Sequence, residues 1–385
     1  MQTISDLVLD KLNTLLVVVN NKGEVEYISD SAKRILGFEP EQLLGENWWI
    51  VPRENKTEGK LVKEKILSIM LHDSYQVEQG FEHALKTSKG LVKWFKWSSA
   101  LTADNKLVGI GIDITEKKKT EQKTLEINLA LTEKNKEITD SINYAKKIQQ
   151  AILPSDSFLK TNFKDGFVLY LPKDIVSGDY YFFFENEENK YVAAIDCTGH
   201  GVPGAMMSVI ANSLLKEVFY NKSLTKPDEI LYALDELLFD SLNKNNPDDI
   251  CFDGMDIALC CVNKKTNMLS FAGAMRPMFL VRDGELLEIK GSKYPLGYYF
   301  DKKEFILDTL QLKVGDRIYL STDGYADQFG GNNNKKLNRK AFKELLLSLE
   351  GMDGDEQNSF LDYSLRNWKQ DEEQTDDVLV VGFFI

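Results

Sequence analysis

The sequence of 385 residues has no hydrophobic run long enough to cross a membrane. Its longest apolar stretch near the N-terminus, Leu15–Val19, falls far short of the roughly 20 residues that a membrane-spanning helix needs. The start of the chain also lacks the charged and then apolar layout of a signal peptide. We therefore expect a cytoplasmic protein that has no membrane partner.

Positive charge is in deficit along the chain. There are 47 lysine and arginine residues against 60 aspartate and glutamate residues, which gives a net charge of −13. Nucleic acids and anionic membranes attract basic surfaces. The balance therefore argues against nucleic acid as a main partner.

Cysteine is scarce, and the four cysteines show no C-x-x-C spacing. A zinc site or a disulfide framework is therefore not indicated. Cys197 could act as the nucleophile of a cysteine phosphatase only with an arginine six residues later to bind phosphate, and position 203 is proline. We expect all four cysteines to be reduced core thiols.

The length of the chain suggests two or three domains, because 385 residues are too many for one ordinary hydrophobic core. Residues 10–115 open with a strand, the turn Asn20–Gly23 and a second strand, and later strands follow around 92–100 and 107–114. The pattern Gly37–Gly45 (Gly-Phe-x-Pro-x-x-Leu-x-Gly) and the closing Asp113-Ile-Thr115 complete a layout that resembles the PAS sensor family. The resemblance implies a PAS domain over residues 1–115, with a five-stranded antiparallel sheet flanked by helices.

The ligand of this segment is not defined by the sequence. A light-sensing flavin domain would need a reactive cysteine here, and residues 1–115 contain none. Haem would need an axial ligand, for which His72 and His83 are the candidates, although each is more simply a surface or hydrogen-bonded histidine. We assign no PAS ligand.

Residues 116–153 are rich in Lys, Glu, Asn and Leu and contain neither Gly nor Pro, which predicts one long helix. A seam with steps of four and three residues runs along it: Leu131, Asn135, Ile138, Ile142 and Ala145. Such a heptad seam is typical of a coiled coil, and a polar residue within it fixes register and oligomeric state. We expect a dimeric coiled-coil linker; the alternative is a solvated helix packed on its own domain.

A histidine kinase with a PAS sensor would carry its phospho-accepting histidine in this helix. The helix contains no histidine, and the chain shows neither a glycine-rich ATP box nor a Walker loop. A kinase is therefore disfavoured.

Four short acidic motifs lie next to apolar runs: Gly178-Asp179, Asp196–Gly201, Asp323-Gly324 and Asp376-Asp377. The runs 191–195 and 317–322 before two of them read as buried strands, so the aspartates would face one another across a sheet or sandwich. Clustered carboxylates are costly unless cations neutralise them, and hard oxygen ligands favour Mg²⁺ or Mn²⁺. The motifs predict a two-metal hydrolytic centre.

The last segment, residues 154–385, reads as many antiparallel strands with helices outside them, which predicts a layered α+β sandwich. Six motifs occur in order: Pro172–Tyr181, Asp196–Ser208, Gly254–Ala258, Phe271–Ala274, Ser321–Gln328 and Asp376–Val381. Together they resemble the metal-dependent PPM (protein phosphatase 2C) superfamily in its bacterial SpoIIE-like branch. The resemblance implies an αββα sandwich that removes phosphate from phosphoserine or phosphothreonine with two Mn²⁺ or Mg²⁺ ions.

The resemblance also implies roles for individual residues. Asp196 would bridge both metals, with the backbone carbonyl of Cys197 as a companion ligand. Asp323 and Asp376 would complete the second metal, and Asp179 would hold the ions directly or through water. Asp377 replaces Asp376 if the register differs by one residue.

The roles of two residues near this predicted site are not decided by the sequence. His200 is either a proton donor to the leaving serine oxygen or a support for its loop. No arginine precedes Asp179 to grip phosphate, and Lys173 is the candidate substitute.

The leading hypothesis is a signalling phosphatase whose PAS domain acts through the helix. By analogy with the family, its substrate is a phosphorylated regulatory protein such as an anti-sigma-factor antagonist. The alternatives are a non-catalytic sensor or scaffold with a degenerate phosphatase fold, and a phosphohydrolase of nucleotides or second messengers.

Overall fold

A computed structural model describes residues 13–70, 80–155, 157–221, 224–243 and 252–385. The chain divides into two compact units, Met1–Asn135 and Lys136–Ile385. The division falls inside the helix that the sequence predicted as a linker over 116–153. His72 and Cys251 lie outside the described residues. No helix in the described ranges combines the length and apolarity of a membrane span.

The first unit is built on a five-stranded antiparallel sheet, as the PAS resemblance implied, and the order of its strands is β2-β1-β5-β4-β3. Its strands are β1 (Thr14–Val19), β2 (Val25–Ile28), β3 (Phe81–Lys86), β4 (Val92–Leu101) and β5 (Leu107–Asp113). Strand β3 was not predicted, because it is an edge strand with only one buried residue and no clean apolar alternation.

Short helices lie between β2 and β3: α2 (Ser31–Leu36), η1 (Pro40–Leu43), η2 (Glu46–Trp49) and α3 (Lys56–Met70). Together with the sheet they enclose a core that includes Leu15, Trp49 and Phe95. The indole Nε1 of Trp49 donates a hydrogen bond to the Gly23 carbonyl at 2.8 Å, which ties η2 to the first hairpin turn.

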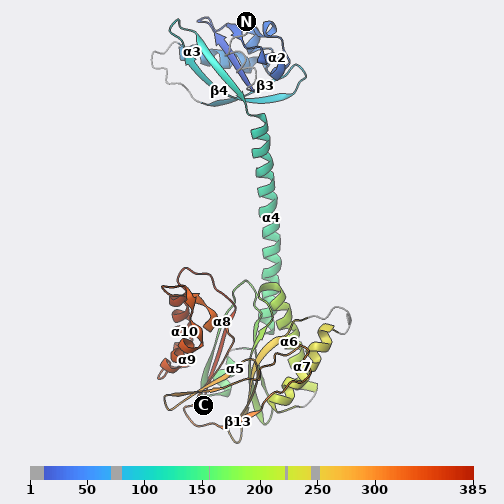
Figure 1. The fold of residues 1–385 in the computed structure, drawn as a ribbon, viewed down its shortest axis with the longest axis vertical. Helices are drawn as coiled ribbons and strands as arrows, with labels where there is room; N and C mark the ends of the chain where they lie inside the picture. Colours follow the sequence, from blue (N-terminus) through green and yellow to red (C-terminus); the bar gives the residue numbers. More distant parts are fainter. Residues whose placement is uncertain (1–12, 71–79, 156, 222–223, 244–251) are drawn as a thin grey trace. The chain divides into compact units, whose positions relative to one another are not determined.

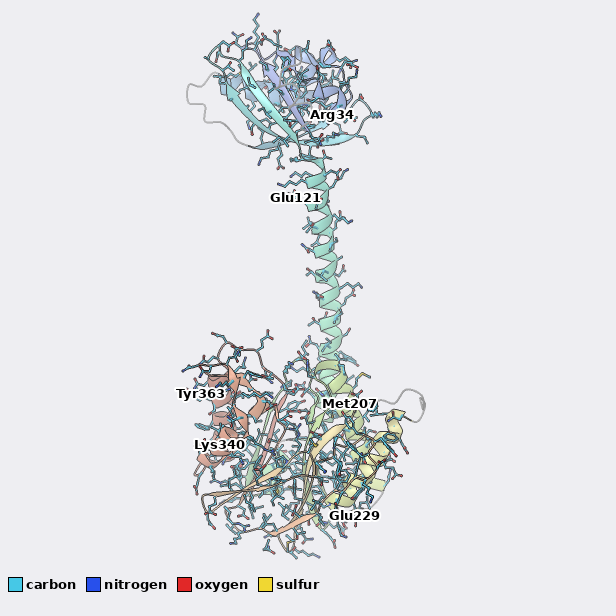
Figure 2. The ribbon with its side chains drawn as sticks, viewed as in Figure 1. Arg34, Glu121, Met207, Glu229, Lys340 and Tyr363 are labelled. Carbon is cyan, nitrogen blue, oxygen red and sulfur yellow. The ribbon has the colours of Figure 1, made fainter. Side chains whose placement is uncertain are left out.

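One helix, α4 (Thr115–Ile152), covers the predicted linker almost residue for residue. Thr115 begins it, and its backbone N–H donates to the Asp113 carboxylate at 3.0 Å. Side chains such as Glu121 project from the helix (Figure 2). Leu131 and Ile138 of the predicted seam are 56% and 57% exposed, so this stretch has no apolar cover from the described residues of its own chain.

The second unit contains two five-stranded antiparallel sheets, ordered β13-β10-β9-β8-β7 and β12-β11-β14-β17-β6. Helices α6 and α7 cover the first sheet and α9 and α10 cover the second (Figure 1). Met207 and Glu229 mark the first helical layer, and Lys340 and Tyr363 mark the second (Figure 2). This is the predicted αββα sandwich, and the predicted α+β class is confirmed.

The strands of the second unit are β6 (Asp165–Leu171), β7 (Asp179–Glu185), β8 (Asn189–Cys197), β9 (Met255–Asn263), β10 (Met268–Ala274), β11 (Met278–Arg282), β12 (Glu285–Ile289), β13 (Asp308–Gln311), β14 (Arg317–Ser321), β15 (Phe329–Gly330), β16 (Lys335–Lys336) and β17 (Val378–Phe384). The helices are α5 (Ser157–Asn162), α6 (Gly201–Asn221), α7 (Pro227–Asn243), α8 (Gly324–Asp327), α9 (Asn338–Ser348) and α10 (Gly354–Lys369).

Successive side chains of a strand point to opposite faces of the sheet, and this alternation places them in different core layers. In β7, Tyr180 and Phe182 pack towards α6 and α7, whereas Tyr181 and Phe183 pack between the two sheets. A third core, which includes Phe342 of α9, lies between the second sheet and its helices. Because β7 is buried on both faces, it reads as a continuous apolar run rather than an alternating one.

Candidate functional site

Three aspartates form a row across neighbouring strands of the first sheet. Asp179 at the start of β7 pairs with Asp196 near the end of β8, and Asp196 pairs with Asp256 in β9. Directly opposite residues in antiparallel strands share a face of the sheet and lie close together. The antiparallel order thus brings the start of one strand and the end of the next to the same edge.

The second sheet adds two more carboxylates at this edge. Asp323 directly follows β14, and Asp376 lies shortly before β17. Both line a pocket of about 300 Å³ together with Asp196 and Asp256. The structure therefore brings together Asp196, Asp323 and Asp376 of the predicted set.

Gly324 makes this approach of strand ends possible. A Cβ atom at this position would lie 1.9 Å from the backbone carbonyl oxygen of Asp377, so only glycine fits. The Asp323-Gly324 pair is consequently more than a surface turn, because its glycine lets the chain after β14 pack directly on the chain before β17.

Arg276, between β10 and β11, is the centre of the acidic cluster. Its Nη2 atom lies 2.7 Å from Asp196 Oδ2, 2.8 Å from Asp323 Oδ2 and 2.9 Å from Asp256 Oδ2. Burial acts to lower the pKa of Arg276, but the attraction of Asp196, Asp323 and Asp256 outweighs it, so the pKa rises. One positive nitrogen is held by three carboxylate oxygens.

The carboxylates remain electrostatically strained despite this arginine. Burial raises the pKa of Asp196 to about 7 against the pull of Arg276, with repulsion from Asp323 and Asp256 adding to the rise. Burial also raises the pKa of Asp256 to about 6, again opposed by Arg276. The pKa of Asp376 rises for the same first reason, burial. Additional positive charge in the cluster would therefore stabilise the ionised carboxylates.

Asp179 lies behind the pocket rather than in its wall. It is 3% exposed, and its Oδ2 accepts a hydrogen bond from Thr322 Oγ1 at 2.7 Å. Burial and then repulsion from Asp196 raise its pKa well above the ordinary value. Through Thr322 it joins the end of β14 to the row of aspartates on the first sheet.

Oxygen donors of this kind fit a hard divalent cation such as Mg²⁺ or Mn²⁺. Within the described ranges, however, no three His, Cys, Asp or Glu side chains form a ready-made metal cluster. The point where three carboxylates converge holds Arg276 Nη2 instead. Asp196, Asp256, Asp323 and Asp376 could hold cations there, in positions that Arg276 would have to leave.

Asp376 and its neighbour Asp377 have different positions. Asp377 is 3% exposed, and its carboxylate accepts hydrogen bonds from the backbone N–H groups of Lys173 and Gly178, both at 2.7 Å. It therefore anchors the loop that leads into Asp179, while Asp376 faces the pocket.

A small polar network lies at the rim. The Nδ1 atom of His200 is 2.8 Å from Asp174 Oδ2, and its Nε2 atom is 3.1 Å from Lys173 Nζ. The charge of Lys173 also acts to lower the pKa of Asp376. Lys173 and His200 are thus beside the acidic pocket and half-exposed to solvent.

Cys197 lines the same pocket, but its thiol is not available as a nucleophile. The residue is 3% exposed, and burial raises the pKa of the thiol well above its ordinary value. The side chain stays protonated at neutral pH, which leaves the backbone carbonyl as its polar contribution.

Sequence reasoning missed two residues of the cluster. Asp256 lies within the motif Gly254–Ala258, but its pairing with Asp196 depends on the register of β8 and β9. Arg276 carries no motif of its own, and only the turn after β10 brings it to the carboxylates.

Comparisons with known proteins agree with this architecture. A model of the family "Stage II sporulation protein E (SpoIIE)" matches residues 187–383, and a PAS domain model matches residues 13–116. The first match contains Asp196, Asp256, Asp323 and Asp376 and begins after Asp179. A search of curated proteins found no match.

Two solved structures are similar to parts of this chain, and the first of them supports the same fold. The SiaA-PP2C domain of Pseudomonas aeruginosa is 30% identical, with a TM-score of 0.60, over 65% of this chain and 98% of that chain. A Bacillus subtilis SpoIIE structure, comprising the PP2C phosphatase domain and a fragment of the regulatory domain, is 15% identical, with a TM-score of 0.48, over 85% of this chain and 88% of that chain. The two family resemblances read from the sequence are confirmed.

The raised pKa of Asp256 predicts a stability change with pH in metal-free protein. Its folded pKa of about 6 exceeds the ordinary 3.8, so its contribution to stability is present below about pH 4 and is lost as pH rises through 6. At pH 8 in chelator, Asp256→Asn should raise the free energy of unfolding by roughly 1 to 3 kcal/mol.

Denaturant unfolding between pH 4 and pH 8 measures this difference. Asp371→Asn, at an exposed position, is the matched control and should leave the curve unchanged. If Asp256→Asn lowers the free energy of unfolding at pH 8, the ionised Asp256 carboxylate does not destabilise the fold as predicted.

Proposed function

The chain belongs to the SpoIIE family, and on that premise we propose that its second unit is a metal-dependent protein serine/threonine phosphatase. The observation that carries the proposal is the convergence of Asp196, Asp256, Asp323 and Asp376 on one pocket. The raised pKa values of Asp196, Asp256 and Asp376 support a site that holds cations. The buried thiol of Cys197 supports a mechanism without a covalent phosphoenzyme.

The proposed ligands follow from the placement of the side chains. Asp196, in the middle of the row, would hold both cations, with the Cys197 carbonyl as a companion ligand. Asp323 and Asp376 bind from the second sheet, and Asp256 is added to the set. The buried position of Asp179 favours a contact through water. When bound, two Mn²⁺ or Mg²⁺ ions lower the pKa of a bridging water and neutralise phosphoryl oxygens.

The cationic side chains of the pocket would bind the substrate. Arg276 is long and charged, and it has an Nε atom that is buried without a hydrogen-bond partner among the described residues. Released from the carboxylates, its guanidinium can pair with phosphoryl oxygens. Lys173 at the rim suits the same anion. His200, bonded to Asp174, can hold the proton that a leaving serine oxygen requires.

The proposed substrate is a phosphorylated protein, such as an anti-sigma-factor antagonist. A relative includes the RsbU and RsbW domains of Rv1364c from Mycobacterium tuberculosis. The pocket is open at a half-exposed rim, which suits a phosphoserine or phosphothreonine on a protein surface. The compartment proposed for this reaction is the cytoplasm.

Turnover of p-nitrophenyl phosphate and of a phosphoserine peptide tests the proposal. Purified full-length protein should hydrolyse both with Mn²⁺ and stop in chelator, and Asp196→Asn should lose at least about a hundredfold in kcat/KM because a bridging ligand is gone. Asp283→Asn, in an exposed turn where asparagine suits the backbone φ of 52°, is the control and should retain activity.

Two other results would replace this function. Turnover that is absent in all metals, or that persists in chelator, would favour the non-catalytic scaffold. Nucleotides that outcompete the phosphopeptide would favour a nucleotide phosphohydrolase on the same carboxylates.

Regulation by the PAS domain is the second part of the proposal, and it runs through α4. Near its end, Gln149 is 4% exposed. Its Nε2 donates to the Ser177 carbonyl at 2.6 Å and to Ser208 Oγ at 2.9 Å, while its Oε1 accepts from the Ser177 N–H at 3.2 Å. Ser177 lies two residues before Asp179, and Ser208 lies on α6. A shift of α4 would therefore move the backbone that positions Asp179.

Gln149→Met tests this coupling, because methionine keeps the length and removes the hydrogen bonds. It should lower the free energy of unfolding by about 1 to 3 kcal/mol, since the buried Ser177 groups lose their partner. Mn²⁺-dependent turnover of protein that remains folded should also fall. Gln150→Met, an exposed neighbour, is the control. If folded Gln149→Met protein keeps full turnover at subsaturating Mn²⁺, Gln149 has only a structural role.

A second copy of the chain is the proposed partner of α4. The exposed Leu131 and Ile138 and the polar Asn135 are three of the five residues of the predicted seam. Ile142 and Ala145, by contrast, are half-buried in the single chain, at the end of the helix that Gln149 anchors. The dimeric stretch would therefore be N-terminal to residue 142.

Light scattering on the full chain should give a dimer of the 43.9 kDa chain. The double variant Leu131→Lys, Ile138→Lys should shift it to monomer, because two lysines per helix would face their equivalents across the seam. Leu129→Lys changes an equally exposed leucine off the seam and should stay dimeric. If the unaltered chain is monomeric at micromolar concentration, the proposed dimeric coiled coil is wrong.

A further inference from the structure

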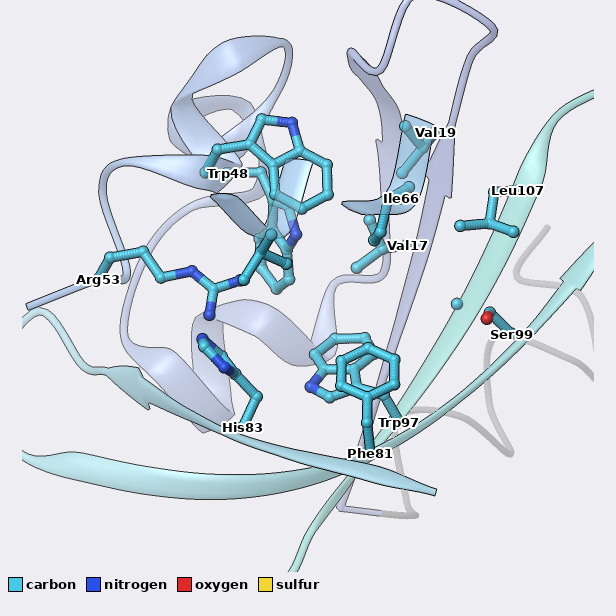
Figure 3. Close-up of a pocket in the computed structure, with 13 residues that line it drawn as sticks. Val17, Val19, Trp48, Arg53, Ile66, Phe81, His83, Trp97, Ser99 and Leu107 are labelled. Atoms are coloured by element: carbon cyan, nitrogen blue, oxygen red, sulfur yellow. The ribbon is translucent and has the colours of Figure 1, made fainter. Parts of the chain in front are cut away.

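The PAS unit contains a cavity between its sheet and its helices that the phosphatase proposal does not use. Val17, Val19 and Leu107 line it from the sheet, and Trp48 and Ile66 line it from the helices (Figure 3). Its volume of about 50 Å³ compares with about 10 to 15 Å³ for one water molecule on the same measure. The space suits a small molecule with an apolar body and is too small for a porphyrin.

One charged side chain lies in this apolar wall. Arg53 is only 9% exposed, and its Nε and Nη1 atoms are buried with no hydrogen-bond partner among the described residues. Burial lowers the pKa of Arg53 to about 10, so the guanidinium keeps its charge at neutral pH. A buried cation is costly unless an anion pairs with it.

His83, from β3, lies beside Arg53 on the same side of the cavity (Figure 3). Burial and then the charge of Arg53 lower the pKa of His83 to about 4, so its ring is neutral and has one N–H to donate. Its buried Nε2 has no hydrogen-bond partner among the described residues, and the carboxylate oxygen Glu58 Oε1 is 3.8 Å away.

Glu58 does not neutralise the arginine in this structure. It attracts Arg53 electrostatically, but its side chain is 49% exposed, and no ion pair joins the two among the described residues. The cavity thus combines an apolar wall, a buried cation that has no ion-pair partner within the described ranges, and a neutral hydrogen-bonding ring.

We propose that this cavity binds a small monocarboxylate. The carboxylate pairs with the Arg53 guanidinium and accepts a hydrogen bond from His83, and the hydrocarbon or aromatic body packs against Val17, Trp48 and Leu107. A cation is excluded by Arg53, a neutral apolar molecule leaves the guanidinium unpaired, and an inorganic anion cannot use the apolar wall. The proposal does not depend on phosphatase activity, because it concerns binding alone.

Calorimetric titration of the full chain with sodium butyrate and sodium benzoate tests the site. The neutral amides of the same shape, butyramide and benzamide, are the matched ligands and should bind at least about tenfold more weakly, because they lack the charge-assisted bond to Arg53. At least one of the two acids should bind with measurable heat.

Arg53→Met should weaken binding of the acid by about tenfold or more and leave the amide unchanged. Arg34→Met, on the exposed face of α2, is the control and should bind both as the unaltered chain does. If Arg53→Met does not fold, the comparison of acid with amide on the unaltered chain still decides the matter. Equal affinity for acid and amide, an unchanged Arg53→Met affinity for acid, or no binding of either acid would overturn the proposal.

Discussion

Repulsion among buried carboxylates is the constraint on which the second unit depends. Asp179, Asp196 and Asp256 occupy directly paired positions on three strands of one sheet, and Asp323 and Asp376 approach from the other. Burial and mutual repulsion raise the pKa values of four of them, Asp179, Asp196, Asp256 and Asp376. Such a cluster lowers the stability of the fold unless positive charge pairs with it. The two-sheet sandwich supplies the rigid edge that holds it together.

Arg276 supplies positive charge to this cluster. A single guanidinium nitrogen lies within 2.9 Å of three carboxylates and partly neutralises them. This single charge does not offset the effect of burial, so the pKa values of Asp196 and Asp256 stay raised. The proposed role of Arg276 in phosphoryl binding requires this side chain to leave the carboxylates. The anchors around the site, Asp377 for the entry loop and Gln149 for α4, connect its geometry to the rest of the chain.

Much of this arrangement could be predicted from the sequence, because burial leaves strong patterns. The continuous apolar run of β7, the helix α4 and the six motifs all predicted their elements. Strand β3 could not be predicted, since an edge strand with one buried residue lacks periodicity. Asp256 and Arg276 could not be predicted as site residues for a different reason. Their roles come from strand register and from a turn, which are tertiary features, and Arg276 belongs to no recognisable motif.

The most direct test of the cation site is a crystal structure of the full chain grown with Mn²⁺, with the metal positions fixed by anomalous scattering. Manganese is expected within about 2.5 Å of carboxylate oxygens of Asp196 and Asp323, with the Arg276 guanidinium withdrawn from them. An Arg276 that still bridges Asp196, Asp256 and Asp323, with no anomalous peak in the pocket at millimolar Mn²⁺, would contradict it.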